Sequence, residues 1–366
     1  MGKSKKNFYD MYNDLSVQIK SHHFQAGEKL PSESEFMAQY HISRYTVRKV
    51  LEQLEKEQII VKHQGKGCFV QEQFSPISLP KRSGQILLIA SRAEHFYFMQ
   101  CINGIEKALA DSEYTLTIKF SNYNADIEAA LLFEAFNNNY AGILLFPSDS
   151  GFIHTNQYLY RFIEEHHIPC ISCGNILPFV HIPSVNTDDY LGGKLAARCF
   201  LQHGHSTFAC IMNREEYSGC MRYAGFIGEL RTSSELVKND CVYWFGHLEK
   251  DSMFEEPACQ ALLKMAEQAT AFFCFNDIAA VQLVNLLTAH GYRVPEDISV
   301  IGYDDSYLCE TCPVSLTSLH QNPEQVGFVA AQNLLHLIED PQYDCNKSFL
   351  PFLVERSSVK DITHSS

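Results

Sequence analysis

The chain has 366 residues, of which 46% are hydrophobic and 20% are charged, and it contains a single Trp. That composition is typical of a folded protein with room for two or three domains, and it excludes a disordered or fibrous chain. Residues 1–82 hold 13 Lys and Arg against 9 Asp and Glu, a net +4, whereas residues 83–366 carry −18, so only the N-terminal segment has a charge that suits nucleic acid.

Residues 32–54 predict two short helices. Ser32 and Glu35 have the spacing of a capping box, so we expect a helix to begin at Glu33 and to end near Tyr40. Ser43 is the expected N-cap of a second helix. The apolar residues of this second helix recur at helical spacing: Val47, Val50, Leu51 and Leu54. Its open face then carries the polar residues Arg44, Thr46, Arg48 and Lys49.

A hairpin follows the second helix. Residues 59–61 and 68–70 are short apolar runs joined by a glycine-rich turn, which predicts a wing with Lys66 at its tip. A helix N-terminus with two arginines can bond phosphates through its free N–H groups and reach guanine edges with a guanidinium group. An isolated pair of arginines is more often a solvated charged face, but the ordered combination of two helices and a wing favours DNA binding.

These motifs resemble the winged-helix domain of GntR-family transcription regulators, which share a Leu-Pro-Ser-Glu segment, a Ser-Arg-x-Thr-Val-Arg segment and a Gly-rich wing. The resemblance covers about residues 8–70. It implies that Arg44 and Arg48 contact bases or phosphates and that Glu33 lies at the DNA edge of its helix. It also implies that Ser43 and Thr46 hold backbone phosphates. The wing residues that would enter the minor groove are Gln64, Gly65, Lys66 and Gly67.

Residues 71–84 contain two prolines, three serines and a glycine without a helical or strand period, so they predict a linker after an N-terminal domain at residues 1–70. From residue 85 onward, short apolar strands alternate with amphipathic helical stretches, and the alternation starts again near residue 208. We therefore expect an α/β fold in which a small winged helix-turn-helix domain precedes two lobes with parallel sheets.

The part of the chain after the linker resembles the effector domain of LacI/GalR-type repressors. The phrases that carry this resemblance occur in order: residues 183–188, Gly192-Gly193, His203-Gly204-His205, Arg222-x-x-Gly225-Phe226, Phe275-Asn276-Asp277, residues 294–305 and Leu316-Thr317-Ser318. The resemblance implies the periplasmic-binding-protein fold, that is, two doubly wound lobes with a sugar in the cleft between them. It places an N-lobe at residues 85–203 and 322–344 and a C-lobe at 204–321 and 345–366. The chain would then cross between lobes near Gly204, Asn322 and Asp344.

A sugar site can be read from the chemistry of the residues that follow the predicted strands. Sugar hydroxyls both donate and accept hydrogen bonds, so the site needs carboxylates, amides and a guanidinium group, with an aromatic ring against the C–H face. Asp188, Asn276 and Asp304 each follow a predicted strand. By the resemblance, the hydrogen-bonding residues are Asp188, Arg222, Asn276, Asp304 and Gln321, and the aromatic residues are Phe96 and Phe98. Other interpretations stay open, namely helix caps for Asp277 and Asp305 and a turn position for Asn276. Arg222 could instead form a surface or interlobe ion pair, and both phenylalanines could be core residues.

The 13 cysteines are odd in number and scattered, which is typical of a reducing compartment. Cys170/Cys173 and Cys309/Cys312 have Cys-x-x-Cys spacing, but the two pairs are farther apart in sequence than in most four-cysteine zinc sites, so we expect no metal and no cofactor. The N-terminus has no apolar signal segment, and no apolar run approaches the roughly 20 residues that span a bilayer. These features predict a cytoplasmic protein.

As a whole, the combination of a GntR-type head and a LacI/GalR-type body resembles the arabinose repressors. The resemblance implies a homodimeric, sugar-responsive transcriptional repressor that binds a palindromic operator and is released by L-arabinose. A different sugar, a phosphorylated metabolite or a protein corepressor stays open as the effector, and an aminotransferase-like body with pyridoxal phosphate is disfavoured by the two-lobe pattern. The sequence has no catalytic triad, P-loop or His-Glu-x-x-His motif, so we expect no enzymatic activity.

Overall fold

The computed structural model describes residues 8–20, 24–56, 59–63, 66–71, 84–92, 96–151, 156–232, 240–249 and 252–363. The chain divides into two compact units, Met1–Lys81 and Arg82–Ser366. Within the described residues, no helix is both long enough and apolar enough to cross a membrane. The predicted linker lies almost wholly outside the described residues, since only residues 71 and 84 of it are described.

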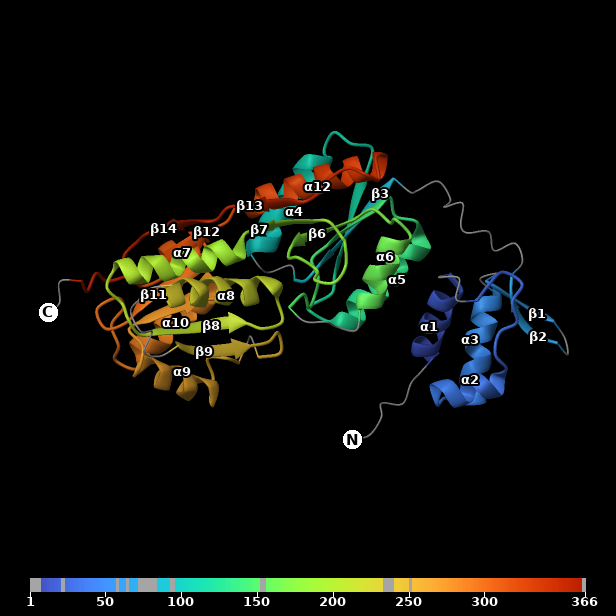
Figure 1. Cartoon of the computed structure of the whole chain (residues 1–366), viewed down its shortest axis with the longest axis horizontal. Helices are drawn as coiled ribbons and strands as arrows, with labels where there is room; N and C mark the ends of the chain where they lie inside the picture. Colours follow the sequence, from blue (N-terminus) through green and yellow to red (C-terminus); the bar gives the residue numbers. More distant parts are fainter. Residues whose placement is uncertain are drawn as a thin grey trace. The chain divides into compact units, whose positions relative to one another are not determined.

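The N-terminal unit is a winged helix (Figure 1). Its elements are α1 (Phe8–Lys20), α2 (Glu33–Tyr40), α3 (Arg44–Lys56), β1 (Ile60–His63) and β2 (Gly67–Val70). Both halves of the predicted capping box are present at Ser32 and Glu35, and α2 ends at His41 in the left-handed conformation. The strands β1 and β2 pair antiparallel to form the wing. The four apolar residues predicted on α3 are all buried, so α3 turns its remaining face outward.

The C-terminal unit contains two six-stranded sheets. The sheet of the N-lobe has the order β13-β7-β6-β5-β3-β4, and all of its neighbouring strands pair parallel. Its strands are β3 (Gln85–Ala90), β4 (Thr115–Phe120), β5 (Gly142–Leu145), β6 (Cys170–Gly174), β7 (Ser184–Thr187) and β13 (Lys347–Phe349). Two helices, α4 (Phe96–Leu109) and α12 (Pro323–Glu339), share one core cluster with this sheet, while α5 (Ala125–Asn138) and α6 (Gln157–Glu165) share the other.

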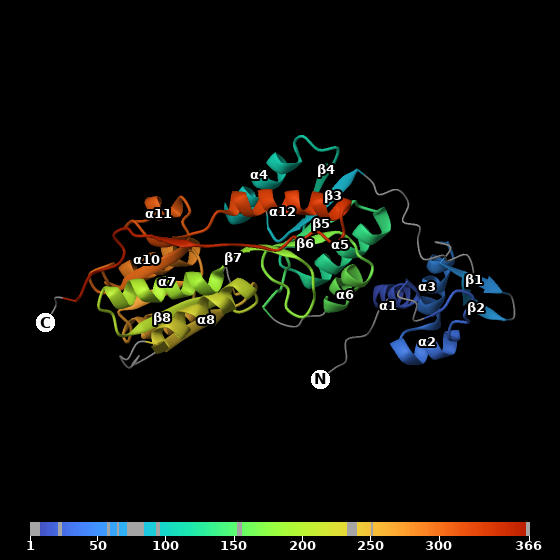
Figure 2. The ribbon, with the colours of Figure 1, turned by 45° about the horizontal axis from the view of Figure 1, so that its top comes forward.

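The sheet of the C-lobe has the order β14-β12-β11-β10-β8-β9, and β14 is the antiparallel strand at its edge. Its strands are β8 (Phe208–Asn213), β9 (Asp240–Phe245), β10 (Ala271–Cys274), β11 (Ser299–Asp304), β12 (Thr317–His320) and β14 (Phe352–Val354). Its helices are α7 (Asp189–Gln202), α8 (Tyr217–Thr232), α9 (Ala258–Ala266), α10 (Asp277–Ala289) and α11 (Leu308–Thr311). The helices α7 and α8 lie side by side in both views (Figures 1 and 2). A Cβ atom on Gly193 would lie 1.9 Å from the Arg222 carbonyl oxygen, so this close approach requires glycine.

Two of the three predicted crossings between the lobes are wrong. The chain crosses before α7, not near Gly204, because α7 packs against α8 and against β14 of the C-lobe. It crosses for the last time between Phe349 and Phe352, not near Asp344, because β13 pairs with β7 of the N-lobe and β14 pairs with β12. The remaining crossing lies at Asn322, between β12 and α12. The errors share one cause, since the sequence marks where strands and helices end but not which sheet they join.

Candidate functional site

The open face of α3 presents two arginines that a single carboxylate holds in place. The Arg44 Nε atom donates to Glu33 Oε2 at 3.0 Å, and the Arg48 Nε atom donates to Glu33 Oε1 at 2.9 Å. Burial acts to raise the pKa of Glu33, but the hydrogen bond from Arg48 and the charges of both arginines lower it overall, so the carboxylate stays ionised. The two guanidinium groups are therefore oriented before any partner arrives, although their side chains are more than half exposed.

The other predicted DNA-contacting residues lie at the start of α3 and in the wing. The Ser43 hydroxyl accepts a hydrogen bond from the Thr46 backbone N–H at 3.2 Å and lies 2.9 Å from the Thr46 hydroxyl, as expected of a helix cap. Lys66 is exposed in the hairpin turn, where its N–H donates to the His63 carbonyl. Gly67 begins β2 with a φ of 112°, a conformation that favours glycine. Gln64 and Gly65 lie outside the described residues.

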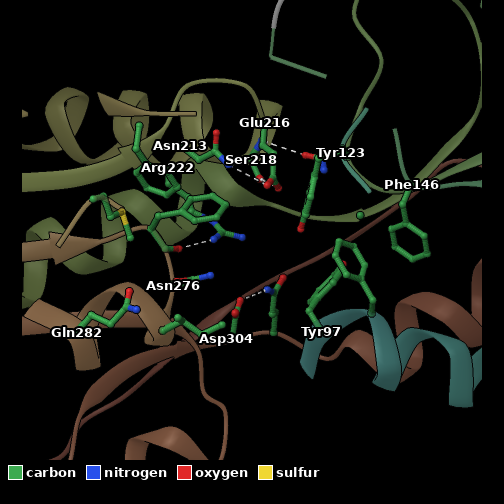
Figure 3. Close-up of a pocket in the computed structure, with 18 residues that line it drawn as sticks. Tyr97, Tyr123, Phe146, Asn213, Glu216, Ser218, Arg222, Asn276, Gln282 and Asp304 are labelled. Carbon is green, nitrogen blue, oxygen red and sulfur yellow. Dashed lines mark hydrogen bonds between the residues drawn. The ribbon is translucent and has the colours of Figure 1, made fainter. Parts of the chain in front are cut away.

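The C-terminal unit has a pocket between its lobes, where the carboxyl ends of parallel strands meet (Figure 3). Asn213 ends β8, Asp304 ends β11, and Asn276 follows β10. The polar lining residues are Asn175, Asn213, Glu216, Ser218, Arg222, Asn276, Gln282, Asp304 and Gln321. The aromatic lining residues are Tyr97, Phe98, Tyr123, Phe146, Phe245 and Phe275. The pocket is thus rich in amides, carboxylates and flat rings.

Arg222 is the cationic residue of this lining, and its charge is already engaged. Its Nε atom donates to Asp189 Oδ1 at 2.8 Å, and its Nη1 atom donates to the Phe275 carbonyl at 2.6 Å. The guanidinium carbon lies 3.5 Å from the Tyr303 ring centroid and 4.8 Å from that of Phe275. Burial raises the pKa of Asp189, whereas the charge and the hydrogen bond of Arg222 lower it. Arg222 therefore does form an ion pair, but the pair is buried within the C-lobe and lies neither at the surface nor between the lobes, and Arg222 also lines the pocket.

Asp304 is a buried acid at the floor of the pocket. It is 7% exposed, and Gln321 Nε2 donates to its Oδ1 at 2.6 Å. Burial raises the pKa of Asp304 to about 8, with the Arg222 charge acting against this shift and the Asp277 charge adding to it. Asp277 itself accepts hydrogen bonds from the Ser306 N–H at 2.7 Å and the Ser318 hydroxyl at 2.6 Å, so it anchors the loop after β11. Asp304 thus joins Glu216 as a carboxyl group of the pocket lining.

The structure brings five of the seven predicted effector residues to this pocket: Phe98, Arg222, Asn276, Asp304 and Gln321. Asn276 also caps α10 through its side-chain oxygen, which accepts from the Ala279 N–H at 2.9 Å. Asp188 does not line the pocket, since its Oδ1 caps α7 by accepting from the Leu191 N–H. Phe96 does not line it either, and its ring faces Tyr307 at 6.1 Å between centroids.

Several lining residues were not predicted. Phe146 and Asn213 stand at the ends of β5 and β8, so the rule that selected Asp304 could have found them. Glu216 and Gln282 lie beyond strand ends, in or before the helices that follow. Tyr97 and Tyr123 come from the opposite lobe, and only the packing of α4 and of the loop after β4 brings them here.

The two lobes also bond directly across the cleft through a set of contacts that we call the interlobe latch. The Tyr217 N–H donates to the Ser150 hydroxyl at 3.0 Å, and the Ser218 N–H donates to Asn175 Oδ1 at 3.0 Å. The Gly151 N–H donates to the Glu215 carbonyl at 2.9 Å. Beside them, the rings of Tyr123 and His247 stack with centroids 4.0 Å apart. The start of α8 is therefore held by residues of the N-lobe.

The described cysteines do not assemble a metal site, and no group of three or more His, Cys, Asp and Glu residues suited to a metal occurs in the described part of the chain. The two Cys-x-x-Cys pairs lie in different lobes, with Cys170 and Cys173 on β6 and Cys309 and Cys312 at α11. Burial raises the pKa of the Cys173 thiol to about 12, which keeps it protonated at neutral pH. A protonated buried thiol is a poor zinc ligand.

Comparison with known protein families agrees with both units. Residues 10–70 match the family described as "Bacterial regulatory proteins, gntR family", and residues 197–359 match the periplasmic binding protein-like domain. The chain joins a GntR-type winged helix to a periplasmic-binding-protein-like domain. The predicted fold class is confirmed, and this regulator combines the winged helix of bacterial regulatory proteins with a two-lobed domain like that of periplasmic binding proteins.

Curated relatives share this organisation over most of the chain. It is 28% identical to the arabinose metabolism transcriptional repressor of Geobacillus stearothermophilus, over 98% of this chain and 99% of the relative. It is 27% identical to the protein of the same name from Halalkalibacterium halodurans, over 91% and 90% of the two chains. It is 28% identical to the repressor PurR of Vibrio cholerae over 76% of this chain and 81% of the relative. These relatives are named as repressors and not as enzymes, in agreement with the prediction of no enzymatic activity.

Solved structures share the fold of the C-terminal unit. The complex of the transcriptional regulator CelR with cellobiose has a TM-score of 0.66 and 21% identity, and the match covers 87% of this chain and 91% of that one. A LacI family regulator from Enterococcus faecalis with bound ribose has a TM-score of 0.64 and 25% identity, and the match covers 76% of this chain and 99% of that one. The GntR-type regulator thus has a two-lobed unit like those of sugar-binding regulators.

Proposed function

We propose that this regulator is a transcriptional repressor that binds operator DNA through α3 and the wing and releases it when a neutral sugar fills the pocket between the lobes. The observation that carries the proposal is the lining of that pocket, which combines five side-chain amides with aromatic rings and the acids Glu216 and Asp304. Amides both donate and accept hydrogen bonds, as sugar hydroxyls do. Rings suit the C–H face of a sugar.

The charges of the pocket argue against a phosphorylated effector. Among the described residues that line the pocket, Arg222 is the only cationic side chain, and Asp189 neutralises it at 2.8 Å. Glu216 adds an acid to the same lining, and Asp304, whose pKa burial raises to about 8, adds no positive charge to it. A phosphate would therefore enter an acidic, partly buried space without a free cation to bind it, which costs desolvation energy with no compensating ion pair.

L-Arabinose is the specific effector that we propose. The support is the name of the two relatives that cover nine-tenths or more of this chain. Figure 3 shows the polar side chains of Asn276 and Asp304 in the C-lobe opposite the ring of Tyr97 in the N-lobe, an arrangement that suits a sugar.

The control of DNA binding follows from linkage. The sugar changes operator affinity only by the difference between its affinities for two arrangements of the protein, typically about 1–3 kcal/mol, or roughly 5- to 150-fold. We infer that two chains associate as a homodimer and that their winged helices bind the two halves of a palindrome about one helical turn apart, or a multiple of it. Because its target is chromosomal DNA, we place the repressor in the cytoplasm.

Thermal unfolding of the full-length protein tests the effector class. L-Arabinose should raise the apparent Tm by mass action, whereas arabinose 5-phosphate should not. The Asp304→Asn variant keeps the size of the side chain and should lose much of the shift with L-arabinose. A shift with the phosphorylated sugar alone would refute the proposed effector class, and no shift with any free sugar would point to a protein corepressor. In the same samples, fluorescence anisotropy of labelled operator should show release by the stabilising sugar.

A further inference from the structure

We propose that Tyr45 is a base-reading residue of α3 that contacts the 5-methyl group of one thymine in each operator half-site. The inference rests on the proposed binding of operator DNA by α3, and it adds a specificity-determining residue to that site. Tyr45 occupies the x position of the Ser-Arg-x-Thr-Val-Arg segment, between Arg44 and Thr46.

The first observation is the exposure of Tyr45. Its relative accessibility is 72%, and it is the only large hydrophobic side chain that is exposed among the described residues of the N-terminal unit. By contrast, Tyr40 on the neighbouring helix is 1% exposed, and its hydroxyl donates to Asp14. Packing of the domain therefore does not account for an aromatic side chain at position 45.

The second observation is the place of Tyr45 on the helix. An α-helix turns by about 100° per residue, so the buried residues of α3 lie together on one side. Those residues are Val47, Val50, Leu51 and Leu54. On the same helical wheel, Tyr45 lies roughly 180° from the middle of that buried side. It is thus the centre of the outward face, with Arg44 and Arg48 on one flank and Thr46 on the other.

The third observation is the neighbour of Tyr45 one turn along. Lys49 lies four residues after Tyr45, and its Nζ atom is 6.0 Å from the Tyr45 ring centroid. This distance is at the edge of the range for a cation–π contact. The ammonium group thus lies beside the Tyr45 ring on the outward face of α3.

The chemistry of the major groove selects the base. Its floor offers hydrogen-bonding groups on every base pair, but the 5-methyl group of thymine is the apolar feature that it presents. The two guanidinium groups suit guanine O6 and N7, whereas the face of a phenol ring suits a methyl group. A rigid aromatic side chain at the centre of the outward face therefore reads a thymine beside the bases that the arginines read.

Replacement of thymine by deoxyuridine tests this contact, because it removes only the methyl group. We would select the operator with the full-length protein from random duplexes and then exchange each thymine in turn. The wild-type protein should lose about fourfold in affinity at one thymine per half-site, which corresponds to one methyl group withdrawn from water. The Tyr45→Ala variant should bind the thymine and uracil operators equally at that position. The Tyr45→Phe variant should keep the full difference.

A matched control is Tyr343→Ala, which removes a 42% exposed tyrosine from the other unit and should leave the uracil effect unchanged. If uracil is tolerated at every position by the wild-type protein, or if Tyr45→Ala responds to uracil as the wild type does, the inference is wrong. If Tyr45→Phe loses as much affinity as Tyr45→Ala, the hydroxyl and not the ring makes the contact, and the methyl-reading role is also wrong. Failure to enrich any sequence would instead refute the proposed function.

Discussion

Alanine at position 151 should weaken effector binding by opening the interlobe latch. Gly151 belongs to the loop after β5, which the N-lobe holds firmly because the Ser148 N–H donates to the buried Glu128 at 2.6 Å and the Ser148 hydroxyl donates to Ser121 at 2.8 Å. A Cβ atom at Gly151 would lie 2.6 Å from the Arg214 carbonyl oxygen, which belongs to the opposite lobe. The clash is therefore between lobes and not within one of them, and the lobes must separate to relieve it.

The size of the effect follows from the contacts that separation breaks. The hydrogen bonds from the Gly151 N–H to the Glu215 carbonyl and from the Tyr217 N–H to the Ser150 hydroxyl would both lengthen. A neutral hydrogen bond contributes about 0.5–1.5 kcal/mol net. The arrangement in which the latch is formed, which we call the closed arrangement, should therefore lose about 1–3 kcal/mol of stability. If the sugar binds the closed arrangement, its affinity should fall by roughly 5- to 150-fold.

Isothermal titration of the wild-type protein and the Gly151→Ala variant with the stabilising sugar measures this loss. Gly84→Ala is the matched control, because its Cβ atom would lie 3.5 Å from the Glu113 carbonyl oxygen, an ordinary contact, and it should bind sugar like the wild type. The Gly151→Ala variant should also need more sugar than the wild type to release operator DNA. An affinity within twofold of the wild type would show that the latch does not take part in sugar binding and would refute the reasoning.

Three further predictions concern single side chains. In anisotropy titrations, Arg44→Ala should lower the affinity for operator DNA by about 1–3 kcal/mol and the affinity for random DNA much less. Lys66→Ala should lower both affinities. Equal losses on both DNAs for Arg44→Ala would contradict a base contact of Arg44. Asp189→Asn leaves the Arg222 guanidinium buried without its carboxylate and should cost about 3–5 kcal/mol in urea unfolding, and an unchanged midpoint would count against the ion pair. Burial raises the pKa of Asp304 to about 8, so the folded protein keeps a proton that the unfolded chain releases near pH 4. The free energy of unfolding should therefore be highest below pH 4 and should fall as the pH rises toward 8. Urea unfolding from pH 5 to pH 8 should show this slope in the wild type, and a slope that persists in Asp304→Asn would assign it to another group.

The local signals of the sequence predicted the DNA-binding unit well. The capping box at Ser32 and Glu35 and the apolar spacing on α3 involve residues within a few positions of one another, so they can be recognised without knowledge of distant contacts. The first helix, α1, was not predicted, although Met11, Leu15 and Ile19 on it contribute to the core. The pairing of Glu33 with both arginines was also not predicted, because it joins two helices.

In the C-terminal unit, the local signals of the sequence predicted only part of the pocket lining. The strand-end rule found Asn276 and Asp304, because parallel strands bring their carboxyl ends to one edge wherever the sheet forms. It also selected Asp188, whose side chain caps α7 instead of facing the pocket. On α4, Phe98 and the unpredicted Tyr97 line the pocket, but Phe96 does not. The rotation of α4 is set by its close contact with α12, where a Cβ atom on Gly104 would lie 2.0 Å from the Glu324 carbonyl oxygen.

The sequence by itself determined the two kinds of unit, the two helices and wing that carry the predicted DNA-contacting residues, and the alternation that makes two parallel sheets. These features depend on residue type and short spacing, which the chain carries along its length. Only the tertiary structure decided where the chain crosses between lobes, that Asp189 neutralises Arg222, and that Ser150 and Gly151 bond to residues 217 and 215 at the start of α8. Each of these depends on atoms tens or hundreds of residues apart, and their distances are fixed only when both lobes have packed.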